Sequence, residues 1–429
     1  MKNGVNILEE TIGNTIIYAT QGTGYLFEIE IGIVQINISN LNIVGIYFLT
    51  GQATNKGCFL FEAKPSVITP TDPVADGGLW NSTMKNINIL GFNGNGIYLK
   101  GGTASGQSAS FVPNQFNIFE NVRVFKNNDT NFSLFSNALK MTGQVGQHSF
   151  INCQFDGYTK TTNDVKTYDK WINVSIENTT NDYMSSAVVT FLNCTIQDSD
   201  YGVRINYAEN ITFDNCWFEN LGVAITVIGN IESSKSINIL NNRFANASGF
   251  GSLLAPNNIK AGQCISVNKS VVNIYNNYVT ASDPNGVDNG SAFVLGFQDN
   301  GGINCHNNTF RNDNPKLSKT FGIMQSVIIA TTINCKSNKL VFIGQPIPPI
   351  PPVVPIPTVK NIISAINAGE ILNIRANGIT ITFDNTGNIF LTNRTTFSLS
   401  NGEIASFKKI DIGTNNETYQ LLSFTKTTP

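Results

Sequence analysis

Charged side chains are scarce in this chain of 429 residues. Asp, Glu, Lys and Arg together make up 13% of the sequence, and the formal net charge is −2. A protein that binds nucleic acid neutralises phosphates with clustered Lys and Arg, and this sequence has no basic run and no basic domain. We therefore expect no nucleic-acid partner.

Histidine is rarer still, with only His148 and His306 in the chain, so no histidine-based mechanism is compelling. The seven Cys are odd in number, lie at predicted strand positions and include no C-x-x-C pair. We interpret them as small buried hydrophobic residues rather than disulfides or metal ligands. No cluster has metal-ligand spacing and no glycine-rich phosphate loop precedes a helix, so we predict no metal site and no cofactor. A surface Ca²⁺ held by loop oxygens stays open as an alternative.

Long apolar runs are also missing. Residues 1–10 contain no stretch long enough for a signal peptide, and no later segment is long enough to span a bilayer. We therefore expect no membrane contact. If the protein works outside a cell, it reaches that place as part of a particle, by lysis, or after trimming of the coding region.

A repeated hexapeptide is the main positive signal: apolar, polar, Asn, Cys or Asn, polar, apolar. Each copy predicts a short strand, a tight turn with Asn in the left-handed region, and a second short strand. The clearest copies span residues 150–155, 191–196, 213–218 and 239–244, and further copies span 274–279 and 305–310.

The spacing of these copies predicts the fold class. Between Asn152 and Asn241, successive Asn positions lie 41, 22 and 26 residues apart. A horseshoe or propeller would keep a nearly fixed period, whereas a parallel β-helix tolerates loops of any length at its corners. We predict an all-β protein with a right-handed, single-stranded parallel β-helix. Stacked rungs ~4.8 Å apart would align the repeated Asn side chains into a hydrogen-bonded ladder, with Cys as a small buried substitute.

The domain organisation follows from where this pattern starts and stops. We predict a strand-rich cap or first coils over residues 1–50 and the β-helix with loop insertions over 51–343. Residues 344–359 are rich in Pro and predict an extended spacer, with a docking peptide as the alternative. Residues 360–429 predict a small carboxyl-terminal β domain for trimerisation or carbohydrate binding. Since about 70 residues make a small core, trimerisation would supply the missing burial.

Two segments of the chain resemble phage tailspikes. The coils over residues 84–343 are similar to the trimeric right-handed β-helix of these pectate-lyase-like depolymerases. Residues 387–403 resemble a short module near the carboxyl end of phage spike and fibre proteins. The resemblance implies a homotrimer, a virion (phage tail) or extracellular location, and a bacterial surface polysaccharide as the partner.

The sequence also departs from that family. The particle-binding head and the Asp- and Gly-rich entry motif of tailspikes do not precede Asn14, so contact with a phage baseplate or tail requires a missing head or another route. The paired Asp and the Gly-His-Gly of the pectin-hydrolase branch are absent as well. No catalytic residue is therefore carried over from the family.

Long insertions follow the Asn corner at residues 125–137, 156–170, 245–262, 280–291 and 311–321, and insertions in repeat proteins cluster on a binding face. In the strand after this corner, the alternation of residues 202–206 predicts that Arg204 and Asn206 point outward. This column suits an acidic glycan, with aromatic faces for sugar rings. A merely solvated sheet face is the alternative. The equivalent outward positions are Tyr98, Lys100, Lys140, Trp171, Asn173, Ala224 and Thr226.

Carboxylates near this column are the candidates for catalysis. Glycoside hydrolysis needs two carboxylates ~5 to 9.5 Å apart, one as acid and one as nucleophile or base. We predict Glu177 paired with Glu209 or Asp200. A lyase would instead use Tyr207 or Lys140 as base and Arg204 to neutralise a uronate. The predicted substrate-binding residues are Arg204, Lys140, Trp171, Tyr207, Tyr183 and Asp169.

These observations predict a tailspike-like receptor-binding protein that binds and depolymerises a bacterial capsular or surface polysaccharide. Glycoside hydrolysis is favoured over β-elimination. The alternatives are a non-catalytic glycan-binding adhesin or structural appendage, and a secreted polysaccharide lyase.

Overall fold

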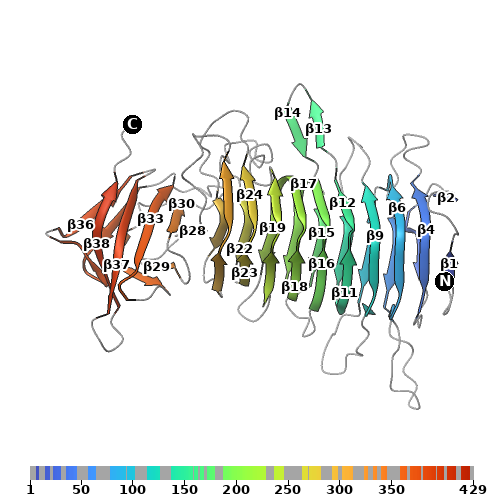
Figure 1. The fold of residues 1–429 in the computed structure, drawn as a ribbon, viewed down its shortest axis with the longest axis horizontal. Coiled ribbons are helices and arrows are strands. Elements are labelled where there is room, and N and C mark those ends of the chain that lie inside the picture. Colours follow the sequence, from blue (N-terminus) through green and yellow to red (C-terminus); the bar gives the residue numbers. More distant parts are fainter. Residues whose placement is uncertain are drawn as a thin grey trace, which may run out of the picture.

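The computed structural model of this chain is a right-handed parallel β-helix that continues into antiparallel strands at the carboxyl end (Figure 1). Among the residues described, no helix is long and apolar enough to cross a membrane. The structure describes residues 6–8, 15–19, 23–29, 35–45, 57–63, 78–92, 94–101, 114–125, 137–157, 159–162, 165–168, 172–178, 187–228, 236–245, 263–268, 270–281, 292–297, 302–312, 323–326, 332–335, 340–344, 358–364, 368–377, 380–392, 394–400, 403–411 and 417–425.

Each rung of the helix contributes strands to three faces, and every strand pairs in parallel with its equivalent on the next rung. Face 1 contains β11 (Val145–Ile151), β16 (Ala187–Leu192), β18 (Glu209–Asp214), β20 (Ile237–Leu240), β23 (Val271–Tyr275) and β26 (Gly302–His306). Face 2 contains β12 (Gln154–Asp156), the first halves of β17 (Thr195–Asn206) and β19 (Trp217–Ile228), β21 (Arg243–Ala245), β24 (Tyr278–Ala281) and β27 (Thr309–Asn312). Face 3 contains β5 (Gly57–Glu62), β7 (Ile97–Lys100), β10 (Asn137–Thr142), β15 (Ile172–Glu177), the second halves of β17 and β19, β22 (Gln263–Asn268), β25 (Ala292–Phe297) and β28 (Ile323–Ser326).

The first rungs are built from longer strands. β4 (Asn37–Val44), β6 (Thr83–Leu90) and β9 (Ile118–Phe125) each run through faces 1 and 2 without a break. β1 (Asn6–Leu8) and β2 (Thr15–Tyr18) pair in parallel with β4, and β3 (Tyr25–Ile29) pairs with β5, so the rung pattern already exists near the amino end.

The repeated hexapeptide forms the corner between faces 1 and 2, as the sequence predicts. Its first Asn lies in the left-handed region, with φ of 54° at both Asn152 and Asn193 and 52° at Asn215. These side chains stack along the axis, and Asn215 Nδ2 donates to Asn193 Oδ1 at 2.7 Å. An Asn at this position adopts the left-handed conformation that the turn requires, and its side chain can hydrogen-bond to the equivalent Asn on the next rung.

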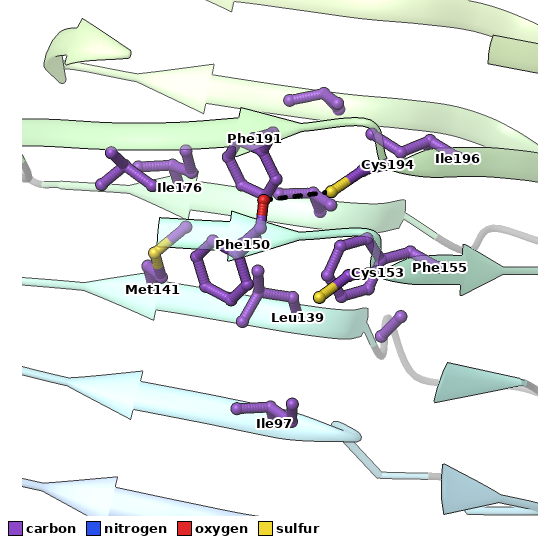
Figure 2. Close-up of a cluster of buried hydrophobic side chains, with 14 of the residues drawn as sticks. Ile97, Leu139, Met141, Phe150, Cys153, Phe155, Ile176, Phe191, Cys194 and Ile196 are labelled. Atoms are coloured by element: carbon purple, nitrogen blue, oxygen red, sulfur yellow. Dashed lines mark hydrogen bonds between the residues drawn. The ribbon is translucent and has the colours of Figure 1, made fainter. Parts of the chain in front are cut away.

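The residue after this Asn points into the core. Cys153, Cys194 and Cys216 are buried, and burial raises the pKa of the Cys194 thiol well above its usual range. Cys194 Sγ donates to Phe150 O at 3.3 Å (Figure 2). In later rungs Asn replaces Cys and forms the predicted ladder: Asn277 Nδ2 donates to Asn308 Oδ1 at 2.9 Å.

Stacked aromatic rings fill the interior beside this corner (Figure 2). Phe119, Phe150, Phe191 and Phe213 occupy one position on four successive rungs, with ring centroids 4.6, 4.8 and 4.7 Å apart. All four side chains have no exposed surface. The rung spacing of a parallel sheet therefore brings identical side chains into offset stacking.

The carboxyl-terminal strands have a hydrophobic core of their own, which includes Phe383, Phe407 and Tyr419. β30 (Leu340–Gly344) pairs in parallel with β33 (Ile371–Asn377), and β33 then pairs in antiparallel fashion with β37 (Ile404–Asp411). β38 (Glu417–Thr425) completes this arrangement. Residues 345–357 of the predicted Pro-rich spacer lie outside the described part of the chain, and the domain boundaries stay a prediction.

Candidate functional site

Two columns of side chains line the outer surface of face 3. The strand register places one residue of each column on every rung, two residues apart along the strand. The first column contains Tyr98, Lys140, Ser175, Arg204 and Thr226, and the second contains Lys100, Thr142, Glu177, Asn206 and Ile228.

Two positions predicted to face outward are wrong. Asn173 and Ala224 are fully buried, and Asn173 Nδ2 donates to Gln197 O at 2.7 Å. Arg204 pairs with Ser175 and with Thr226, so the positions equivalent to Arg204 lie further along β15 and β19 than Asn173 and Ala224. On β15 the two columns therefore contain Ser175, which is itself buried, and Glu177.

Glu177 lies between two cations from the adjacent rungs. Lys140 Nζ is 3.9 Å from Glu177 Oε2, and Arg204 Nε is 3.9 Å from Glu177 Oε1. These side chains are 27%, 40% and 30% exposed for Lys140, Arg204 and Glu177. Both ion pairs are long and open to solvent, so each contributes at most about 1 kcal/mol to stability. The arrangement therefore leaves all three groups available to a ligand.

An aromatic ring extends this site toward the amino end. Lys140 Nζ lies 5.6 Å from the centroid of the Tyr98 ring, and the Tyr98 hydroxyl is 3.0 Å from Thr142 Oγ1. Tyr98 on β7 thus continues the first column next to Lys140 on β10. Sugar rings stack on such faces while their charged groups contact the cations.

Two buried oxygens beside Glu177 lack hydrogen-bond partners among the described residues. Ser175 Oγ lies between Lys140 and Arg204 in the register, and Asn206 Oδ1 belongs to the residue paired with Glu177. An unpaired buried oxygen costs free energy. A ligand hydroxyl that reaches these atoms when Lys140 or Arg204 turns toward the ligand would recover part of that cost.

The two predicted partners of Glu177 lie at different separations along the chain from Asn206, the residue paired with Glu177. Glu209 begins β18 three residues after Asn206, and three residues span at most ~11 Å. Asp200 lies six residues before Asn206 on β17. Along the chain, Glu209 is therefore the nearer of the two to the residue paired with Glu177, and both partners stay predictions.

Other predicted site residues are placed incompletely. Tyr207 occupies the corner after Asn206 with a φ of 53° and is half-buried. Trp171, Tyr183 and Asp169 lie outside the described part of the chain, and so does the side chain of Asp200. Their roles stay predictions. Among the described residues, no three His, Cys, Asp or Glu side chains are grouped to hold a metal ion.

Face 2 carries a set of side chains that were not predicted from the sequence. Trp217, Arg243 and Tyr278 are aligned on three successive rungs. Trp217 Nε1 donates to Glu219 Oε2 at 3.0 Å. The hexapeptide contains the signal, because its fifth position follows the buried Cys or Asn and must point outward. The outward positions that alternation predicts all lie in the strands after this corner.

Asp156 is the carboxyl group with the most unusual environment on face 2. Its side chain is 1% exposed, and Oδ2 lies 3.3 Å from Arg123 Nη2. Burial raises the pKa of Asp156 to about 6, and the nearby Asp198 adds to this shift, while Arg123 opposes it. Asp156 Oδ1 has no hydrogen-bond partner among the described residues. This burial keeps Asp156 from direct contact with a polymer on the outer surface.

No protein-family model matches the sequence, and no curated protein sequence matches it.

The fold is similar to those of solved β-helix proteins. The tailspike of Escherichia coli bacteriophage HK620, as a double mutant, is 10% identical, with 94% of this chain and 77% of that chain covered and a TM-score of 0.45. Tailspike protein 2 from an Escherichia coli O157:H7 bacteriophage is 13% identical over 73% of this chain, with a TM-score of 0.38, and the match covers 36% of that longer protein. The A-module of mannuronan C-5 epimerase AlgE4 from Azotobacter vinelandii is 11% identical, with 75% and 84% covered and a TM-score of 0.37. At these values the likeness is one of fold.

Proposed function

We propose that this chain binds an acidic polysaccharide of a bacterial surface, such as a capsule, and depolymerises it by glycoside hydrolysis. The observation that supports the proposal is the position of Glu177 between Lys140 and Arg204 on the outer surface of face 3. A flat sheet lined by cations, an aromatic ring and a carboxylate matches the groups of an acidic sugar polymer.

Each side chain has a distinct part in the proposed reaction. Lys140 and Arg204 hold the carboxylates of the polymer and orient the glycosidic bond over Glu177. Glu177 acts as the base that activates water, or as the nucleophile at the anomeric carbon. Glu209 protonates the oxygen of the departing sugar. Water supplies the hydroxyl group of one product and, through the carboxyl groups, the proton of the other.

Replacing Glu177 with Gln tests this mechanism. Gln keeps the size of the side chain but cannot accept a proton, so we expect the release of reducing ends from a cleaved polysaccharide to fall by about 10²-fold to 10⁴-fold. The assay uses a panel of acidic bacterial surface polysaccharides. Glu120→Gln is the matched control, because Glu120 forms an ion pair with Lys85 at 3.0 Å on face 1.

The outcomes separate the competing functions. If Glu177→Gln and Glu209→Gln both cleave as fast as the wild type, this site is not catalytic. A lyase would release products with the ultraviolet absorbance of an unsaturated uronate. If the wild type binds a polysaccharide and never shortens it, the protein is a glycan-binding adhesin or appendage.

We further propose that the protein is a homotrimeric, extracellular spike of a virion. Ile371, Phe390 and Leu422 of the carboxyl-terminal strands are 44%, 52% and 47% exposed in the single chain, and contact between copies would cover such apolar side chains. Light scattering should give three times the chain mass of 46.6 kDa. The mass of a monomer would contradict the proposed trimeric spike, but it would not contradict the proposed glycan site.

A further inference from the structure

Face 2 presents a cation stacked between two aromatic rings. The Arg243 guanidinium carbon lies 4.4 Å from the centroid of the Trp217 ring and 5.6 Å from that of the Tyr278 ring. Arg243 is exposed, whereas both aromatic residues are half-buried. The rings hold the guanidinium group in place on the surface and cover its two faces.

This stacking leaves the edge of the guanidinium group open. Within the described part of the chain, Arg243 forms no ion pair with a carboxylate, and the nearby Glu219 is hydrogen-bonded to the Trp217 indole instead. The in-plane N–H groups of Arg match the two oxygens of a carboxylate. The half-buried rings of Trp217 and Tyr278 next to it supply apolar contact for a sugar ring.

Two strands connect this surface to the site on face 3. β17 and β19 cross from face 2 to face 3 as unbroken strands. On the neighbouring rungs the same connection is longer in sequence, with residues 157–171 between β12 and β15 and residues 246–262 between β21 and β22. Among these four rungs, β17 and β19 are therefore the two that the structure describes as one continuous strand from face 2 to face 3.

The surface over β17 and β19 is polar, and it is long enough to hold several sugar residues. Asp198 and Asn220 lie at the bend, where Asn220 Nδ2 donates to Asp198 Oδ1 at 3.1 Å. From Thr195, which is paired with Trp217, to Arg204 is nine residues of β17, or ~30 Å at the spacing of an extended strand. That span requires a polymer of several sugar residues.

We propose that Trp217, Arg243 and Tyr278 form a second binding platform for an acidic sugar, joined to the Glu177 site by the strip over β17 and β19. This inference rests on the proposed function, because both sites hold the same acidic polysaccharide. One polymer chain then lies along β17 and β19, with one charged sugar at Arg243 and another at Arg204. The platform fixes where the polymer crosses the rungs and favours long chains over short ones.

Binding measurements on the full chain test the platform. The probes are acidic and neutral bacterial surface polysaccharides immobilised on an array, together with short and long fragments of each acidic polymer. Because a charged hydrogen-bonded contact is lost, Arg243→Gln should weaken binding to a long acidic chain by about 10-fold to 100-fold. Arg243→Lys should fall between the Gln variant and the wild type, since Lys keeps the charge but lacks the planar fork.

Fragment length and matched variants give the specific readout. The difference in affinity between Arg243→Gln and the wild type should be large for long chains. It should be smaller for fragments that are too short to reach both sites. Lys85→Gln removes one positive charge from the ion pair on face 1 and should leave affinity unchanged. Trp217→Ala should weaken binding to long chains as Arg243→Gln does, and equal melting temperatures show that the Arg243 variants remain folded.

The results distinguish this platform from the proposed catalytic site. If Arg243→Gln loses affinity for long chains and the wild type cleaves none of them, the result supports the platform and contradicts the proposed hydrolase activity. Cleavage that depends on Glu177, with unchanged affinity in Arg243→Gln, supports the hydrolase and overturns the platform. The platform is also overturned if the wild type binds only neutral glycans or none on the array.

Discussion

Replacing Phe191 with Ala should lower the free energy of unfolding by about 3 to 5 kcal/mol. The Phe191 ring has no exposed surface and stacks on Phe150 at 4.8 Å and on Phe213 at 4.7 Å. Rungs above and below are held by their own parallel pairing, so the core cannot collapse easily into the space that Ala leaves. A large cavity would remain and interrupt the stack.

Thr190→Ala is the control on the same strand, because Thr190 is half-buried on the outer surface of β16. It should change the free energy of unfolding by about 0.5 kcal/mol or less. Urea denaturation of the three proteins at one protein concentration measures the difference. Equal stability of Phe191→Ala and Thr190→Ala would contradict the account of the core.

The protein should lose stability in mild acid because of His148. Its Nδ1 accepts a hydrogen bond from Asn117 N at 3.3 Å, and Nε2 is buried with no partner among the described residues. Burial lowers the pKa of His148 to about 3, from an ordinary value of 6.5. The unfolded chain therefore binds a proton that the folded chain excludes. Stability is fully present above pH 6.5 and is lost as the pH falls, by about 2 to 3 kcal/mol at pH 4.5.

Asp156 has the opposite effect on the free energy of unfolding over the same pH range. Its pKa in the folded protein is about 6 instead of 3.8, so the folded chain binds a proton more readily than the unfolded chain does. Acidification from pH 6 to pH 4 therefore stabilises the fold at this group. The measured change in the wild type is the sum of both effects, and a His148 variant is needed to separate them.

His148→Asn makes that separation. On the preceding rung, Asn117 Oδ1 accepts a hydrogen bond from Ser82 N, just as His148 Nδ1 accepts one from Asn117 N. The Asn side chain of the variant can therefore accept the same hydrogen bond from Asn117 N. The smaller side chain should cost about 1 to 3 kcal/mol, equally at both pH values. Between pH 7.5 and 4.5, urea denaturation should show a loss of stability in the wild type relative to the variant. Parallel pH profiles for the two proteins would rule out His148 as the acid-sensitive group.

Much of the fold was predictable because one corner is repeated along the chain. The Asn of each hexapeptide must occupy the left-handed region, and the next residue must point into the core. Both demands appear at Asn193 and Cys194 as the sequence predicted. The downstream ladder at Asn277 and Asn308 was predictable for the same reason, since parallel rungs place equal positions above one another.

The outer surface of face 3 was less predictable because its strands begin at corners without a common motif. Alternation assigned the outward direction of Arg204 from its own strand, but the start of β15 could not be located, and Asn173 proved to be buried. Glu177 was selected for its acid chemistry, whereas its position between two cations depends on register. Register across loops of variable length is a three-dimensional property that spacing does not encode.

The arginine stack on face 2 was missed for a different reason. Trp217, Arg243 and Tyr278 are 26 and 35 residues apart in sequence and occupy the same position of three hexapeptides. Aligning the copies by their Asn residues is enough to bring the three positions together. The pattern that defines the hexapeptide lies in its turn and its inward positions, whereas the outward fifth position varies between Trp, Arg and Tyr and gives no signal in a single copy.

The most direct test of this account is a crystal structure of the Glu177→Gln variant with an oligosaccharide that the wild type releases from its polymer. The account predicts that the glycan lies across β10, β15 and β17, with a sugar carboxylate in ion-pair contact with Lys140 or Arg204 and a glycosidic bond beside residue 177. A glycan bound only to another part of the surface, with the Lys140 and Arg204 column empty, would contradict the central claim.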